Sequence, residues 1–218
     1  NIGWAAHAPH HSTEELNYAV ALRASVTQRL FSFLFYWPMV VIGFSAEAVV
    51  AMVAFHLLLQ FLPHTRVVPK LPAWISSWMN TPSHHRVHHA RNDRYLDKNY
   101  GGFLIIWDKL FGTFAPETEE CSYGLTSPPN TWDPTVINFQ TWAKLIGDFV
   151  AARSLWDKVR IWVMPTGWRP AGLAPRVGPT WRDAHGREIK FASVQLPGTS
   201  AYLVVQTLAA MPLMLLVS

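Results

Sequence analysis

The sequence is poor in charged side chains and in cysteine. Only 15% of the 218 residues are charged and 50% are hydrophobic, whereas soluble domains carry about 25% charged residues. This deficit favours a protein in contact with a membrane. The single cysteine, Cys121, excludes a disulfide within the chain and metal sites built from several thiolates. No segment alternates Lys or Arg with aromatic residues, so the net charge of +4 fits a cytosolic membrane surface better than nucleic-acid binding.

The longest apolar stretch contains almost no charge. Between Leu30 and Pro63 the only charged residue is Glu47. A bilayer core of ~30 Å needs ~20 helical residues, so this stretch predicts two short spans, over about 28–44 and 46–63, joined at "GFSAE". Basic residues flank this hairpin but are absent from its joint, and the positive-inside bias therefore places both of its ends in the cytosol.

Two histidine clusters share the spacing H-x-x-H-H. "HAPHH" contains His7, His10 and His11, and "HHRVHH" contains His85, His88 and His89. Positions i, i+3 and i+4 lie on one face of a helix, so each cluster aims three imidazoles in one direction. The hairpin returns the chain to its starting face, which brings both clusters to the same side of the membrane. Three imidazole ligands with open positions are typical of catalytic metal sites, and the spacing permits two ions or one ion held from both sides. Imidazole suits Zn, Cu, Fe and Ni, and the spacing does not choose among them.

Other polar residues near the clusters are candidates for supporting roles. His64 follows the second predicted span and is a further candidate ligand, whereas His56 lies deeper in that span and fits a packing or tunnel position. His84 could donate a hydrogen bond behind the ligands, and His185 is expected at the surface. Metal-bound histidines commonly donate their second N–H to a carboxylate or carbonyl, which the nearby polar residues Glu14, Asp93, Asp97 and Asn99 could accept.

The remainder of the chain suggests three regions. Residues 1–125 would form the catalytic domain, 126–198 a cytosolic region with amphipathic and loop segments, and 199–218 a transmembrane segment. Within the middle region, 142–163 has the spacing of an amphipathic helix or helix pair, and 165–179, rich in Pro and Gly, is expected to be a loop. The predicted fold is an all-α integral membrane bundle with a cytosolic, histidine-rich cap that holds two metals.

Two long segments resemble a known family. "WAAHAPHHSTEELNYAVALRAS" and "NTPSHHRVHHARNDRYLDKNYGGFLIIWDKLFGTF" are similar to the fatty acid hydroxylase/sterol desaturase superfamily, and within it to the alkylglycerol monooxygenase-like branch. The resemblance covers residues 1–125, and "YGLTSPPNTWDP" more loosely. It implies an integral membrane oxygenase of the bacterial inner membrane or endoplasmic reticulum, with a di-iron centre facing the cytosol. Such enzymes hydroxylate or desaturate lipid chains with dioxygen and supplied electrons.

The resemblance also assigns individual residues. The family's second histidine box corresponds to the first cluster, its third box to the second cluster, and its isolated histidine to His64. Further motif positions with supporting or substrate-gating roles are Glu14, Asn17, Arg23, Asp97, Asn99 and Asp108. The family's first box, H-x-x-x-H, would precede Asn1, so we expect the site to be completed by residues that this chain does not contain.

Several functional questions stay open at this level. The electron donor could be tetrahydrobiopterin, as the branch suggests, or a ferredoxin or cytochrome; the lipid and the oligomeric state are not defined. A membrane transporter for Zn or Cu is an alternative, but its ligands should follow a path through the spans, which contain only His56. A zinc-dependent lipid hydrolase is another alternative, and it would act without dioxygen.

Overall fold

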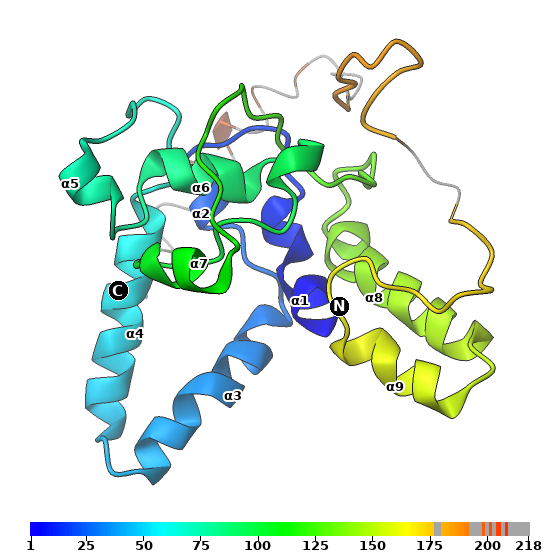
Figure 1. Cartoon of the computed structure of the whole chain (residues 1–218), viewed down its shortest axis with the longest axis horizontal. Coiled ribbons are helices and arrows are strands. Elements are labelled where there is room, and N and C mark those ends of the chain that lie inside the picture. The colour runs from blue at the N-terminus through cyan, green and yellow to red at the C-terminus, as the bar shows by residue number, and fades with distance from the viewer. Residues whose placement is uncertain (177–179, 192–197, 199–200, 202–203, 206–207, 209–218) are drawn as a thin grey trace.

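A computed structural model describes residues 1–176, 180–191, 198, 201, 204–205 and 208. The predicted C-terminal span, 199–218, lies almost entirely outside the described residues. The described residues form no β-strand and only isolated bridges, so the mostly helical fold is confirmed. The helices, shown in Figure 1, are α1 (Ile2–His11), α2 (Tyr18–Ala21), α3 (Gln28–Val41), α4 (Ala46–Phe61), α5 (Ala73–Ser76), α6 (Pro82–His89), the 3-10 helix η1 (Asp93–Tyr95), α7 (Ile106–Phe111), α8 (Pro134–Ala151) and α9 (Leu155–Val163).

Helices α3 and α4 form the predicted apolar hairpin and project from the body of the molecule as a V (Figure 1). Gly43 takes a positive φ of 109° in the turn, which favours glycine, and the Ser45 side chain accepts a hydrogen bond from the backbone N–H of Ala48 to begin α4. The two helices contain 14 and 16 residues. Among the described residues, no helix combines the length and apolar composition required to cross a bilayer. The membrane-spanning interpretation therefore stays a prediction.

Helix α1 lies at the centre of the fold and packs against α3 and α8. Ala5 of α1 shares an apolar cluster with Leu145 of α8 and Ile161 of α9. The segment 142–163 therefore contains a helix pair, one of the two forms that its sequence allowed. Asp133 caps the start of α8 and Ser154 the start of α9, through hydrogen bonds to backbone N–H groups of their first turns.

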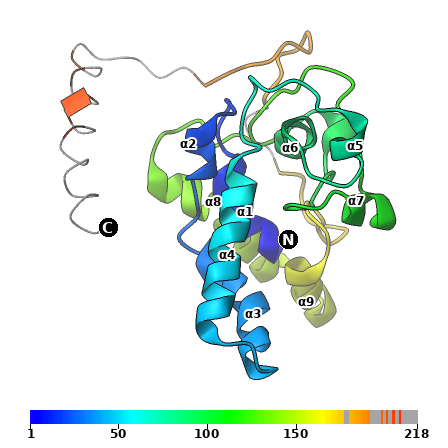
Figure 2. The same ribbon diagram turned by 90° about the vertical axis from the view of Figure 1, so that its left-hand side faces the viewer.

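Above the hairpins, the segments around α6 form a cap (Figure 2). A second apolar cluster holds α6 against the segment that follows α1; it consists of Leu16, Val20, Val87, Ala90, Tyr95, Cys121 and Tyr123. Because α1 carries one histidine cluster and α6 the other, this core brings the two clusters face to face.

The segment 180–191 lies against the cap through a buried arginine. The Arg91 side chain is fully buried, lies 2.7 Å from Glu188 Oε1 and 3.6 Å from Glu14 Oε1, and stacks on the Trp181 ring. These contacts join the segment to the cap, because the buried Arg91 charge finds its closest carboxylate, Glu188, in this segment.

Candidate metal centre

Seven histidines from three segments meet at the base of the cap. Helix α1 supplies His7, His10 and His11, helix α6 supplies His85, His88 and His89, and His64 follows α4. The ring centroids of His11 and His89 are 4.3 Å apart, and those of His64 and His85 are 4.1 Å apart. The clusters predicted to share one side of the molecule are therefore in direct contact.

The seven rings sort into two groups. His10, His64, His85 and His89 form a buried group of four, and His7, His11 and His88 form a more accessible group of three. Within each group the candidate ligand nitrogens all lie within 4.8 Å of one another. Each H-x-x-H-H cluster divides between the groups, an arrangement that favours two ions over a single ion held from both sides.

The nitrogens of the four-histidine group are arranged as metal ligands would be. His10 Nδ1 lies 3.0 Å from the carbonyl oxygen of Arg23, and His64 Nδ1 lies 2.9 Å from that of Gln60. A carbonyl only accepts, so both Nδ1 atoms carry the proton and both Nε2 atoms present lone pairs. These Nε2 atoms are 3.1 Å apart. Two lone pairs at this distance repel each other unless a cation lies between them. Two nitrogens that each lie ~2.1 Å from one metal ion are ~3.0 Å apart when the nitrogen–metal–nitrogen angle is a right angle, close to the observed distance.

The three-histidine group also has an unsatisfied nitrogen. His11 Nε2 is buried and has no hydrogen-bond partner, which is a costly state for a polar atom. His88 Nδ1 lies 3.4 Å from the carbonyl oxygen of Lys98, which leaves its Nε2 as the free acceptor. The donor chemistry of this group therefore also fits a metal ion.

The histidines are held in the neutral form that binds metals. Burial first, and neighbouring imidazoles second, lower the pKa of His7 to about 4, of His10 to about 3 and of His64 to about 4. The same two causes hold the pKa values of His11, His85 and His89 well below 6.5. At neutral pH these rings are therefore neutral imidazoles, the form that can bind a metal ion.

Comparison of the sequence with known proteins shows the family to which the chain belongs. The family model "Fatty acid hydroxylase" matches residues 1–113, more than half of the chain and all seven of these histidines. The chain belongs to the fatty acid hydroxylase family. It is also similar to proteins named alkylglycerol monooxygenase from Xenopus tropicalis (43% identical over 180 residues), Homo sapiens (42% over 209) and Danio rerio (44% over 179).

These alignments cover 82%, 94% and 82% of the chain but 39%, 46% and 39% of the respective relatives. The chain therefore spans less than half the length of the relatives that it matches. No solved structure matches it.

In this fatty acid hydroxylase family member, two of the predicted supporting residues fix the loop that follows α6. Buried Asn99, with a positive φ of 53°, donates to the carbonyl oxygens of His84 and Ala115. Asp108 accepts from the backbone N–H groups of Tyr100 and Gly101, each at 2.7 Å. Both residues fix the loop that contains Lys98, and the backbone carbonyl of Lys98 faces His88. They therefore help to orient His88 indirectly, through the position of this loop.

Arg23 offers its backbone carbonyl to His10, whereas the remaining predicted supporting residues lie elsewhere. Glu14 accepts from the backbone N–H of Phe191 and faces Arg91, and Asn17 caps α2. Asp97 is exposed and accepts from the Tyr100 hydroxyl. His84 lines a different cavity, with its Nδ1 3.2 Å from the Met79 carbonyl oxygen. The hydrogen bonds to the ligand histidines thus involve backbone carbonyls rather than the carboxylates that the sequence suggested.

His56 and His185 lie as expected. His56 is partly buried in α4, where its ring packs against Gly102, and His185 is exposed. Neither belongs to the metal-ligand groups of the described residues.

A cavity of about 450 Å³ adjoins the histidine groups. One wall consists of His7, His10, His64, His85 and His88. The rest of the lining, from the α2–α3 segment, the end of α4 and the segment 99–102, combines apolar residues with the basic residues Arg23 and Arg29 and with amide side chains, among them Gln28 and Gln60. The Gln28 Oε1 atom is buried without a hydrogen-bond partner. Sequence reasoning missed both glutamines, because an isolated amide carries no motif.

Proposed function

We propose that the protein is an iron-dependent membrane monooxygenase that oxidises a lipid alkyl or acyl chain. The observation that carries this proposal is the two groups of neutral imidazoles, which form one wall of a cavity large enough for part of a lipid. The relatives named alkylglycerol monooxygenase support an alkylglycerol ether as the substrate, so that hydroxylation beside the ether oxygen gives a hemiacetal that collapses to an aldehyde and glycerol.

We assign the seven histidines as ligands of two irons. His10, His64, His85 and His89 would hold one, and His7, His11 and His88, which are less buried as a group, would hold the other. Bound iron would supply the redox chemistry that activates dioxygen toward an unactivated C–H bond. One oxygen atom then enters the lipid and the other leaves as water, so the reaction consumes two electrons and two protons from an external donor, a pterin or an electron-transfer protein.

The chain's own residues position the lipid. Leu57 and Phe61 give the cavity an apolar wall for the chain, and Gln28 and Gln60 offer amide groups to a polar head. An amide oxygen left unpartnered in the cavity favours a substrate that brings a hydroxyl group to it. In such a pose a carbon near the head group, rather than one at the far end of the chain, would lie beside the histidines.

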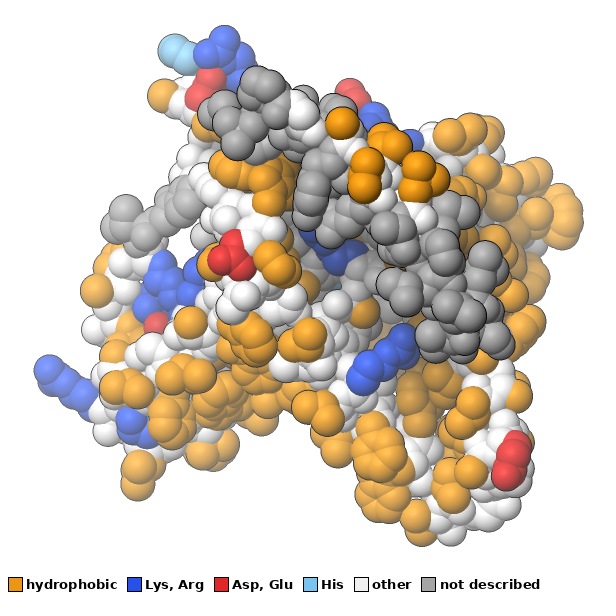
Figure 3. Space-filling view, turned by 180° about the vertical axis from the view of Figure 1, so that it is seen from behind, with side chains coloured by type: hydrophobic (Ala, Val, Ile, Leu, Met, Phe, Trp, Pro, Cys, Tyr) orange, Lys and Arg blue, Asp and Glu red, His pale blue; other side chains and the backbone are white. Residues whose placement is uncertain are grey.

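Lipid access requires contact with a bilayer. Exposed apolar side chains cover the α3–α4 hairpin and the tip of the α8–α9 pair, and Figure 3 shows them gathered over the lower part of the molecule. An exposed apolar surface of this extent fits insertion into a membrane. We therefore propose that both hairpins enter the bilayer and that the cap faces the cytosol.

The test supplies the purified, iron-loaded protein with an alkylglycerol, a reducing pterin and ¹⁸O₂. The expected result is an aldehyde and glycerol, with ¹⁸O in the aldehyde when it is trapped by reduction before exchange with water. His88→Ala should abolish product, whereas the exposed control His185→Ala should keep it. Product formed equally without oxygen would instead support a zinc-dependent hydrolase, and metal flux across vesicles without lipid turnover would support a transporter.

A further inference from the structure

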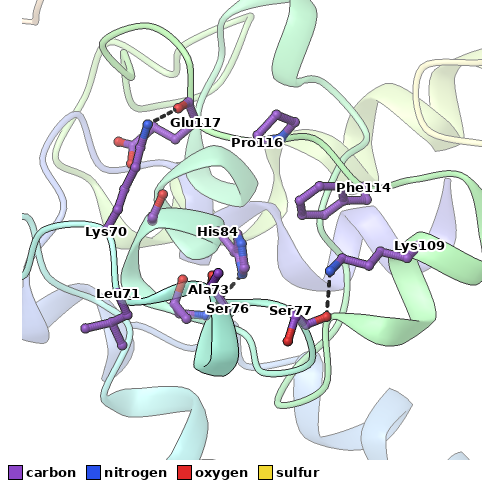
Figure 4. Close-up of a pocket in the computed structure, with 12 residues that line it drawn as sticks. Lys70, Leu71, Ala73, Ser76, Ser77, His84, Lys109, Phe114, Pro116 and Glu117 are labelled. Atoms are coloured by element: carbon purple, nitrogen blue, oxygen red, sulfur yellow. Dashed lines mark hydrogen bonds between the residues drawn. The ribbon is translucent and has the colours of Figure 1, made fainter.

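A second cavity, of about 420 Å³, lies on a different side of α6 from the metal-ligand groups. It is enclosed by α5, the start of α6, α7 and the segment 114–117 (Figure 4). None of the seven histidines lines it; His84 does instead. The chemistry proposed for the metal centre makes no use of this cavity.

Two lysines give the cavity a positive charge. Lys70 and Lys109 reach it from different walls, and each donates one hydrogen bond to a backbone carbonyl, of Glu117 at 2.6 Å and of Ser77 at 2.5 Å. An ammonium group has three donors, so each lysine keeps two for a ligand. The only carboxylate in the lining, Glu117, is paired with Arg86 through two contacts of 2.7 Å. Lys70 attracts this carboxylate without forming an ion pair with it, and Lys109 has no carboxylate partner in the lining.

The start of α6 adds further donors. Thr81, Ser83 and His84 line the cavity at the N-terminus of this helix, whose first turn contains no acidic residue. Backbone N–H groups at a helix N-terminus favour an anion. The Thr81 hydroxyl is buried and faces the backbone N–H of His84 in a capping box, which leaves its own O–H to donate to a ligand. The two lysines, the helix terminus and this hydroxyl are together the kinds of group that bind a phosphate.

The helices that flank the cavity expose large apolar side chains. Trp74 in α5 is 73% exposed, and Leu110 and Phe111 in α7 are 70% and 74% exposed. Tryptophan is enriched at the boundary between lipid and water. A soluble phosphate compound would leave these side chains in water, whereas a lipid would cover them with its acyl chains.

We propose that this cavity binds the phosphate group of an anionic phospholipid whose acyl chains lie along α5 and α7. The inference rests on the proposed function in one respect, which is that the cap lies at a membrane surface. The lipid is structural or regulatory and distinct from the lipid that is oxidised. A zwitterionic lipid such as phosphatidylcholine brings its own ammonium group and should bind more weakly.

Native mass spectrometry of the metal-loaded protein in detergent tests this proposal. The protein is titrated with dioctanoyl phosphatidylglycerol, dioctanoyl phosphatidylcholine or inorganic phosphate. We compare a Lys70→Gln/Lys109→Gln variant with a control, Arg187→Gln/Lys190→Gln, which removes the same charge from exposed residues of the 180–191 segment. We expect phosphatidylglycerol to bind at least about tenfold more tightly than phosphatidylcholine, and the cavity variant, but not the control, to lose this preference.

Three results would overturn the proposal: equal affinity for the two lipids, equal loss in both variants, or inorganic phosphate binding as tightly as phosphatidylglycerol. Metal content, measured in the same samples, shows that the variants are folded. Lipid binding is measured without turnover, so a failure to bind phosphatidylglycerol would leave the oxygenase proposal intact. If the oxygenase proposal failed instead, the lipid-binding measurement could still be interpreted.

Discussion

At the scale of single residues, the chain keeps seven imidazoles neutral by burying them together. The pKa values of His7, His10 and His64 lie at about 4, 3 and 4 in the folded protein, below the value of about 6.5 expected when the chain is unfolded. Between these values the unfolded state binds more protons than the folded state. The stability that these neutral histidines contribute to the metal-free protein is therefore fully present above pH ~6.5, and it is lost as the pH falls toward 4.

Denaturant unfolding of chelator-treated protein between pH 7.5 and 5 measures this loss. Each such histidine contributes at most ~1.4 kcal/mol per pH unit, so the free energy of unfolding should fall by several kcal/mol. Loading with metal should shift the decline to lower pH, because bound metal competes with protons. A free energy of unfolding that stays constant down to pH 5 would show that the rings are accessible to water in the folded protein.

His64 tests the division into two metal-ligand groups. This residue belongs only to the group of four and lies outside both helical clusters. We expect His64→Ala to reduce bound iron from two ions to one per chain, because the three-histidine group remains intact, and to abolish turnover. Metal analysis of the purified variant, with His185→Ala as the control, checks this. Loss of both ions, or of neither, would contradict two separate sites.

At the scale of helices, the sequence predicted the elements but not how the clusters divide. The H-x-x-H-H spacing correctly placed each cluster on a helix, and the uncharged stretch located the hairpin to within three residues. At 3.6 residues per turn, the second and third histidines of each cluster lie about 60° and 40° to either side of the first. Helix α1 therefore contributes His10 to the group of four and His11 to the group of three, and α6 likewise contributes His89 to the first group and His88 to the second. The group that each histidine joins depends on how α1 and α6 face each other. The spacing within one helix does not determine this packing.

Gly101 shows how closely the loop after α6 packs. A Cβ atom at this position would lie 2.5 Å from the Leu104 carbonyl oxygen and 2.8 Å from Asp108 Oδ2. Because one of these contacts is with backbone, the loop has to move. We expect Gly101→Ala to destabilise the protein by about 2 kcal/mol because the added Cβ overpacks the loop. The variant should also lower turnover, since Tyr100 and Gly101 line the cavity beside the histidines.

The matched control is Gly147→Ala in α8, where a Cβ would meet nothing within 4 Å. Alanine is favoured over glycine in a helix by up to ~1 kcal/mol, so this variant should be as stable as the parent or more so. Thermal denaturation and turnover of the two variants measure the difference. Equal behaviour of both would show that the loop tolerates a side chain and does not fix the cavity.

At the scale of the whole molecule, two largely apolar projections extend from the cap. In Figure 1 the turn of the α3–α4 hairpin lies at the bottom and the turn between α8 and α9 at the lower right, so both lead away from the cap but diverge from each other. Sequence reasoning assigned the first projection to the membrane because it lacks charge. It could not decide whether α8 and α9 lie on the membrane or pack on the domain, because their charged residues alternate with apolar ones; the structure shows packing on α1 together with an exposed apolar tip.

Single-cysteine labelling can test whether both projections enter the bilayer. Cys121, the single cysteine of the sequence, is buried and can be replaced by serine to give a cysteine-free background. One cysteine is then introduced for a fluorescent probe, at Phe44 (53% exposed), at Leu155 (81% exposed) or at the exposed control His185. In vesicles we expect a lipid-attached quencher to reduce emission at positions 44 and 155 but not at 185. Insertion of both tips would fix the cap at a constant height above the lipid, because α1 joins the two hairpins through its contacts with α3 and α8. Quenching at 44 alone would mean that the α8–α9 tip instead faces water or another protein, and the proposal that both hairpins enter the bilayer would have to be revised.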